Sequence, residues 1–155
     1  MSIRTTTHLN FRGTARQALD FYQGVFGGRL TLATYGDFGM PQDDPGHDRI
    51  VFGQVENEDG FRVMAYDVPG QDDGGPAATA GTTRRENGTT MTDSAFFQSV
   101  RAEGFEEITR YWNGLADGAT IVEPLAASAW TPGFGMLTDR FGVTWILDVE
   151  PFHAA

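Results

Sequence analysis

The chain has 155 residues, of which 40% are hydrophobic and none is cysteine, and its formal net charge at pH 7 is −10. A chain of this length can bury a substantial core without covalent cross-links. The absence of cysteine excludes a disulfide framework, a thiol nucleophile and a cysteine-based zinc site. The acidic balance argues against nucleic acid as a partner, because a phosphate backbone would be repelled. No apolar run is long enough to span a bilayer, and we expect a cytoplasmic protein with no membrane partner.

Two segments have the periodicity of amphipathic helices. In residues 15–27 apolar side chains recur every three or four positions. Thr14 and Gln17 have the spacing of a capping box at the start of this segment, and Gly27-Gly28 favours its end. A second apolar stripe predicts a helix over about residues 104–117. A shift of the sequence by 90 residues superimposes the two predicted helices without a gap.

Short candidate strands surround each predicted helix, and the order β-α-β-β-β occurs twice. They lie at residues 8–11, 30–35, 49–56 and 61–68 in the first half, and at 96–100, 119–122, 135–137 and 143–149 in the second. This repetition predicts a single domain of residues 1–155, with module 1 at about 7–69, a connector at about 70–94 and module 2 at about 95–150. The connector is rich in Gly, Thr and Asp, and we interpret it as mobile. Asn87-Gly88-Thr89 within it matches a glycosylation acceptor, which we interpret as a coincidence.

The alternation of side chains along each strand predicts a face that no helix covers. In the strand at 8–11, Leu9 and Phe11 should face the helix, so that His8 and Asn10 point the other way. The strands at 61–68 and 143–149 add further side chains to this mixed face. Its expected members are His8, Asn10, Met64, Tyr66, Ile146 and Asp148. Such a face either surrounds a ligand or packs on a partner.

Several motifs together carry a family resemblance over nearly the whole chain. They are HLNFRG at 8–13, ALDFY at 18–22, VFGG at 25–28, Trp130, Phe134-Gly135 and DRFGVTW at 139–145. The first three resemble the opening of the glyoxalase/bleomycin resistance superfamily, also called vicinal oxygen chelate proteins. The others are similar to the ending of its PhnB-like branch. Within the last motif we interpret Asp139 as a turn former ahead of the final strand.

The resemblance implies an α+β fold and, commonly, a homodimer. In that fold two βαβββ modules form a curved mixed β-sheet cleft with the helices on the outer face. Enzymes of the superfamily hold a divalent metal with residues from the first and last strands of each module. His8 is near the first such position, and of Phe97 and Gln98 at the second only Gln98 could ligate. Met64 and Ile146, at the last-strand positions, offer neither oxygen nor nitrogen; a register slip would bring Tyr66 or Asp148 there instead. We therefore expect no tightly bound metal, with His8 as a weak candidate.

We interpret the chain as a PhnB-like protein that binds a small molecule in the cleft and uses no cofactor. The expected lining residues are His8, Asn10, Met64, Tyr66, Gln98, Trp130, Ile146 and Asp148. Trp130 either caps the cleft or anchors the core, and the net charge favours a cationic or neutral ligand. One alternative is a metal-dependent lyase, isomerase or dioxygenase that uses His8 as a ligand. The other is a dimeric protein whose mixed face is mainly interface. No catalytic residue is assigned.

Overall fold

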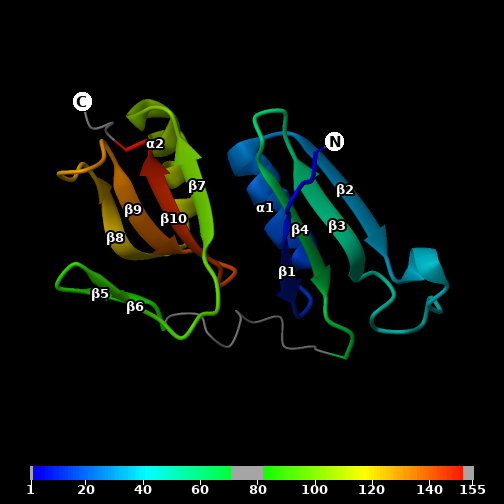
Figure 1. The fold of residues 1–155 in the computed structure, drawn as a ribbon. Helices are drawn as coiled ribbons and strands as arrows, with labels where there is room; N and C mark the ends of the chain where they lie inside the picture. The colour runs from blue at the N-terminus through cyan, green and yellow to red at the C-terminus, as the bar shows by residue number, and fades with distance from the viewer. Residues whose placement is uncertain (1, 71–81, 152–155) are drawn as a thin grey trace. The chain divides into compact units, whose positions relative to one another are not determined.

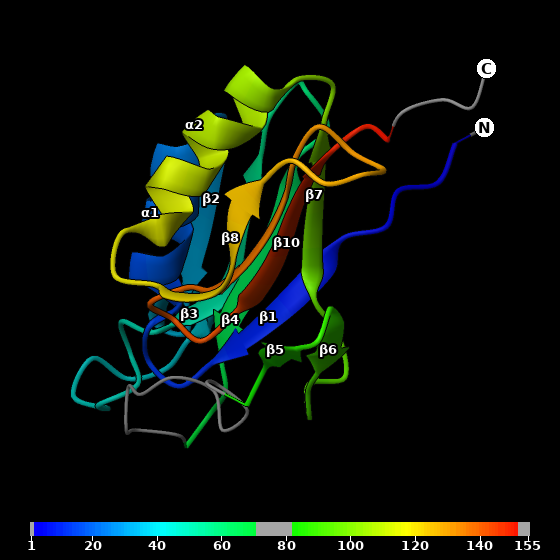
Figure 2. The same cartoon turned by 90° about the vertical axis from the view of Figure 1, so that its left-hand side faces the viewer.

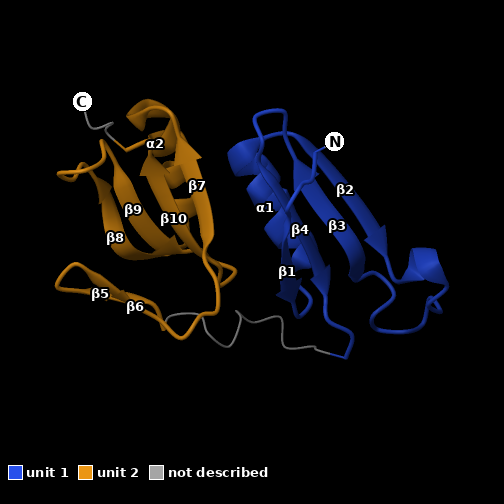
Figure 3. Ribbon diagram, in the orientation of Figure 1, with its two compact units in different colours: residues 1–75 blue, residues 76–155 orange. Residues whose placement is uncertain are grey.

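The structure, a computed structural model of the chain, describes residues 2–70 and 82–151. The chain forms two compact units, residues 1–75 and 76–155, shown in Figure 3. Each contains one four-stranded sheet and one helix of 12 residues, as Figure 1 shows. In the parts of the chain that the structure describes, no helix is long and apolar enough to cross a bilayer.

The first unit follows the expected β-α-β-β-β order. Its elements are β1 (Thr7–Phe11), α1 (Ala15–Phe26), β2 (Arg29–Thr34), the short 3-10 helix η1 (Gly36–Phe38), β3 (Ile50–Glu56) and β4 (Arg62–Asp67). The strands lie side by side in the order β1-β4-β3-β2. β1 and β4 are parallel, and the other pairs are antiparallel. α1 packs on one face of this sheet and buries Leu19 and Tyr22 completely.

The second unit repeats this arrangement. Its corresponding elements are β7 (Gln98–Ala102), α2 (Phe105–Ala116), β8 (Thr120–Ala126), β9 (Phe134–Thr138) and β10 (Thr144–Val149). The strand order β7-β10-β9-β8 is that of the first unit, and β7 and β10 are the parallel pair. Figure 2 shows α2 lying against one side of this sheet. The predicted repetition of β-α-β-β-β is therefore confirmed, although β7 starts two residues later than expected.

The start of α1 differs from the prediction. Thr14 makes no side-chain hydrogen bond to the helix, so the expected capping box with Gln17 does not form. The carboxylate of Asp67, at the end of β4, instead accepts hydrogen bonds from the amides of Gly13 and Ala15. Its other oxygen accepts one from the amide of Ile50. A buried carboxylate from a distant strand thus satisfies the free amides that a local cap would otherwise satisfy.

Both helices lie close to their sheets over a glycine in the third strand. Gly53 pairs with Ala65 in the first unit, and Gly135 pairs with Leu147 in the second. A Cβ atom at Gly53 would lie 2.3 Å from Cδ1 of Leu19, and one at Gly135 would lie 2.7 Å from Cζ3 of Trp112. At each of these positions there is no space for a side chain beneath the helix.

Part of the expected mobile connector is an ordered hairpin. β5 (Arg84–Glu86) pairs with β6 (Thr89–Met91), and Asn87 and Gly88 form the turn with φ values of 51° and 78°. Positive φ at both central residues is characteristic of the type I′ turns that close two-residue hairpins. The sequence analysis placed no strand in this connector, and β5 and β6 correct that expectation. Residues 71–81 of the connector lie outside the described part of the chain.

Candidate functional site

In the first unit, four of the predicted ligand residues form one surface, which we call the first-sheet patch (His8, Asn10, Met64 and Tyr66). On the paired strands His8 lies beside Met64, and Asn10 lies beside Tyr66. His8 and Asn10 are exposed. Leu9 and Phe11, which alternate with them along β1, are buried on the helix side. Met64 and Tyr66 are half-buried. The predicted alternation of β1 and β4 is therefore confirmed.

Contacts within the first-sheet patch orient the imidazole of His8. Its Nδ1 donates a hydrogen bond to Oδ1 of Asn10 over 3.0 Å. The ring also makes an edge-to-face contact with Tyr66, at a centroid separation of 5.2 Å. Because the amide oxygen of Asn10 can only accept, Nδ1 of His8 is the donor in this hydrogen bond. The patch therefore presents hydrogen-bonding groups beside the apolar side chain of Met64, a combination suited to a small polar organic molecule.

In the second unit, the predicted residue Asp148 is paired with an arginine that the sequence analysis did not single out. Arg101 donates from Nε to Oδ1 of Asp148 over 2.9 Å and from Nη2 to Oδ2 over 2.7 Å. The side chain of Asp148 is 6% exposed and that of Arg101 is 49% exposed. These hydrogen bonds and the charge of Asp148 raise the pKa of Arg101. Asp148 is thus a buried partner of a cation, and it is not placed as a free acid or base.

Gln98 lies on the opposite side of its sheet from the position we expected. It pairs with Trp145 on β10, and Trp145 is fully buried beneath α2. The reason is a difference in turn length: three residues separate β1 from α1, whereas two separate β7 from α2. The 90-residue shift that aligns the helices therefore misaligns the first strands by one, which exchanges the two faces. Ser99, beside Ile146, is the true counterpart of His8.

Trp130 lies beside the mixed face of the second sheet. It is 53% exposed, and its ring centroid is 5.7 Å from that of Phe134. Phe134 in turn pairs with Asp148 across β9 and β10, and the guanidinium carbon of Arg85 from the hairpin lies 5.2 Å from the centre of its ring. We expected Trp130 either to cap the cleft or to anchor the core. The second expectation is wrong, because a residue that is 53% exposed does not anchor a core. We call this surface the second-sheet patch (Arg101, Trp130, Phe134, Ile146 and Asp148).

The corrected alignment allows a test of whether the chain fits the divalent metal of the superfamily's enzymes. The first- and last-strand positions are His8 and Met64 in one unit and Ser99 and Ile146 in the other. His8 supplies the only imidazole or carboxylate among them, and a hard or borderline cation needs several such donors. Across residues 2–70 and 82–151 no three His, Asp or Glu side chains form a cluster that could hold a metal ion. The residues present do not fit the metal.

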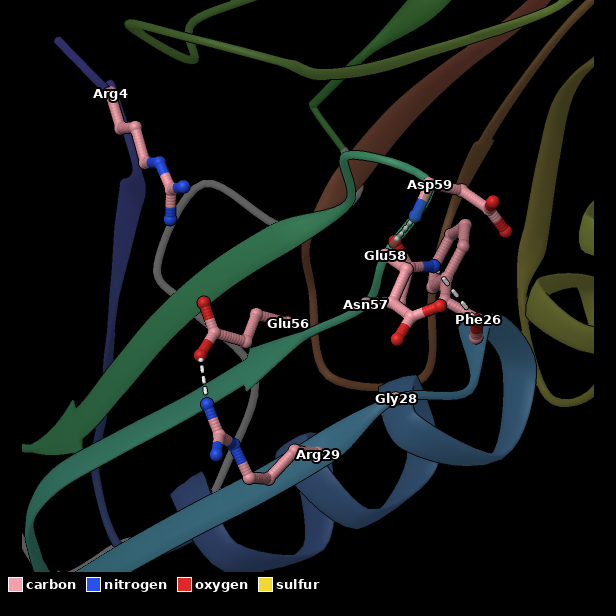
Figure 4. Close-up of a pocket in the computed structure, with 8 residues that line it drawn as sticks. All are labelled: Arg4, Phe26, Gly28, Arg29, Glu56, Asn57, Glu58 and Asp59. Carbon is pink, nitrogen blue, oxygen red and sulfur yellow. Dashed lines mark hydrogen bonds and ion pairs between the residues drawn. The ribbon is translucent and has the colours of Figure 1, made fainter. Parts of the chain in front are cut away.

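A cavity of about 770 Å³ at one end of the first sheet is lined by other residues, shown in Figure 4. Nη2 of Arg29 lies 2.9 Å from Oε1 of Glu56, and the hydrogen bond from Arg29, with the charges of Arg29, Arg62 and Arg4, lowers the pKa of Glu56. The remaining lining residues are Phe26, Gly28, Asn57, Glu58 and Asp59. None of the predicted ligand residues lines this cavity. It combines nearby positive and negative side chains, so its charge selects no ligand class.

Comparison with known proteins identifies the family. Residues 7–147 match the model of the Glyoxalase/Bleomycin resistance protein/Dioxygenase superfamily. The chain belongs to this superfamily. It is 26% identical over 147 residues to protein YjdN of Escherichia coli strain K12, and the match covers 92% of both chains.

Two solved structures show the same fold. Protein PA1353 from Pseudomonas aeruginosa is 28% identical, with a TM-score of 0.74 over 96% of this chain and 98% of that one. The PhnB protein from Bacillus cereus, described as a putative 3-demethylubiquinone-9 3-methyltransferase, is 24% identical, with a TM-score of 0.66 over 96% of this chain and all of that one. The predicted glyoxalase/bleomycin resistance fold and the similarity to PhnB-like proteins are therefore confirmed.

Proposed function

We propose that this PhnB-like protein binds a small molecule on the mixed faces of its two sheets, without a tightly bound metal. The first-sheet patch carries the proposal. An oriented imidazole, an amide and a phenol lie together on a face that α1 does not cover, next to an apolar thioether. Rigid strands hold these groups, so little conformational entropy is lost when a ligand binds.

Thermal melting with a panel of neutral, cationic and anionic aromatic compounds tests this proposal. A compound that binds the folded protein raises the melting temperature, and the shift grows with the logarithm of the ratio of its concentration to its Kd. We expect His8→Ala and Tyr66→Ala to reduce the shift. Gln17→Ala, an exposed change on α1, should leave it intact. A flat response across the panel, or equal shifts in all variants, would contradict ligand binding at this patch.

The metal-dependent enzyme is the alternative that needs a separate experiment. If it were correct, Zn²⁺, Ni²⁺ or Mn²⁺ would bind at about one ion per chain, and His8→Ala would abolish that binding. We expect EDTA-treated protein to melt at the same temperature with and without these ions, because His8 has no second strong donor at the matching positions. A saturable shift that depends on His8 would overturn the metal-free proposal.

We further infer a cytoplasmic homodimer with no nucleic-acid or membrane partner, supported by the family membership and the charge of −10. Sedimentation over a range of concentrations tests the dimer, and a monomer throughout would contradict it. Phe52 is 36% exposed and is next to Gly53 in β3; because Gly53 faces Leu19 of α1, Phe52 is on the mixed face. If Phe52→Asp dissociates the dimer and Tyr66→Ala leaves ligand shifts unchanged, the mixed face is an interface and the binding proposal fails there.

A further inference from the structure

The guanidinium of Arg101 is held in place while part of it stays open. Two parallel hydrogen bonds to Asp148 use its Nε and Nη2 atoms. Within the described chain Nη1 has no hydrogen-bond partner, and the side chain is 49% exposed. The carboxylate of Asp148 is almost fully buried behind it. The Arg101–Asp148 pair is neutral as a whole, but the group that it exposes to solvent is the cationic guanidinium. The two parallel hydrogen bonds fix the orientation of this guanidinium.

Aromatic side chains lie beside this guanidinium. Arg101, Asp148 and Phe134 are neighbours in one row across β7, β10 and β9. With strands about 4.8 Å apart, the backbone positions of Arg101 and Phe134 are about 10 Å apart. Trp130 extends the apolar surface beyond Phe134, and Ile146 lies next to Asp148 along β10. Arg85 adds a second guanidinium over the ring of Phe134. The second-sheet patch thus combines the anchored cation of Arg101 with an aromatic surface at a separation that one small aromatic molecule can span.

We propose that the second-sheet patch binds the carboxylate of an aromatic acid, with Arg101 donating to the carboxylate and Phe134 and Trp130 contacting the aromatic body. This inference rests on the proposed ligand-binding function and names its ligand class. It differs from the preference for cationic or neutral ligands that net charge alone suggested. Asp148 and Glu150 interact electrostatically with Arg101. The other acidic groups act through solvent that screens charge over about 8 to 10 Å, whereas the exposed part of the guanidinium donates at contact distance. The local cation therefore decides the choice.

Isothermal titration with three matched probes tests the proposal: naphthoate, the neutral naphthamide and the cationic naphthylmethylammonium. We expect naphthoate to bind at least about tenfold more tightly than the other two, because only it accepts charge-assisted hydrogen bonds from Arg101. Tight binding of the amide or the ammonium probe with none of naphthoate would overturn the carboxylate inference and leave the proposed function standing. If no probe binds in titration and the wider melting panel is also flat, both proposals fail.

Variants separate recognition by Arg101 from a purely structural ion pair. Because Arg101→Gln alone would leave Asp148 buried without its partner, we pair it with Asp148→Asn. The double variant should fold and bind naphthoate about tenfold or more weakly than both the parent and Asp148→Asn alone, which keeps the guanidinium. Arg110→Gln, an exposed change on α2, is the matched control and should change nothing. Equal naphthoate affinity in the double variant and the parent would overturn the proposal.

Discussion

The carboxylate of Asp67 accepts a hydrogen bond from the amide of Ala15, the first residue of α1, over 3.0 Å and 52 positions of sequence. The same carboxylate accepts from the amides of Gly13 and Ile50. Asp67 is 2% exposed, so all three amides depend on it for a partner that water would otherwise supply. One side chain therefore joins the end of β4 to the start of α1 and the start of β3.

Replacement of Asp67 by Asn should destabilise the protein strongly. The amide retains one acceptor oxygen and turns a donor group toward at least one backbone N–H that it cannot satisfy. We expect a loss of about 3 kcal/mol in the free energy of unfolding. Urea denaturation measures it, and Asp59→Asn in the exposed turn between β3 and β4 serves as the control. A loss no larger than that of the control would contradict the role of Asp67.

Replacement of Gly53 by Ala should cost about 1 to 3 kcal/mol, because the new methyl group would overlap Leu19 in the core. The double variant with Leu19→Ala tests the cause. Removal of the Leu19 side chain leaves space for the methyl group, so Gly53→Ala should cost less in that background. Additive losses in a urea-based double-mutant cycle would show that the overlap is not the source of the destabilisation.

Glu56 should contribute to stability only above acidic pH. Its pKa is lowered below the usual 4.5, mainly by the hydrogen bond from Arg29. The ionised form therefore stabilises the folded protein, fully above pH 4.5, and this contribution is lost as the pH falls through the lowered pKa. Compared with Glu56→Gln, the parent should have the higher urea midpoint at about pH 6, and the difference should shrink at about pH 3. A difference independent of pH would contradict the ion pair.

Gly88→Ala should loosen the β5–β6 hairpin, because Gly88 has a φ of 78° that an alanine adopts only with strain. We expect faster hydrogen exchange at residues 84–91 and at Met136, whose sulfur accepts a hydrogen bond from Thr90. Gly104→Ala is the control, since a Cβ there meets nothing within 4 Å and its φ is −138°. Unchanged exchange in Gly88→Ala would show that the turn does not hold the hairpin.

The fold was predictable because its signals are local and repeated. Both amphipathic stripes end within about a residue of the structural helices, and strand alternation placed His8 and Asn10 on the correct face. Capping was not predictable from neighbouring residues, because the acceptor for Ala15 is 52 positions away. Asp139 was predicted as a turn former; it also accepts a hydrogen bond from the indole of the buried Trp145, which spacing alone does not indicate.

The candidate site was predictable only where alignment between the halves was not needed. The first-sheet patch follows from the alternation within β1 and β4. Gln98 was misplaced because the shift of 90 residues that aligns the two helices is one residue too small for the first strands, and a shift of one exchanges the faces of a strand. Arg101 was missed because the predicted strand ended at residue 100, whereas β7 continues to Ala102. The hairpin had a visible signal in Asn87-Gly88, which is typical of a type I′ turn. We compared those residues only with a glycosylation acceptor, a match that we interpreted as a coincidence, and the neighbouring Gly- and Thr-rich sequence obscured the strands.

The turn between β7 and α2, one residue shorter than its counterpart, has a consequence for how such sheets diverge. Both strands end on a buried residue, Phe11 before a turn of three residues and Ala102 before a turn of two. The turn therefore absorbs the gain or loss of one residue, and the strand keeps the same face toward the helix. Related proteins that differ by one residue in this turn would then show the same side of β7 to solvent, although their sequences align there only with a gap.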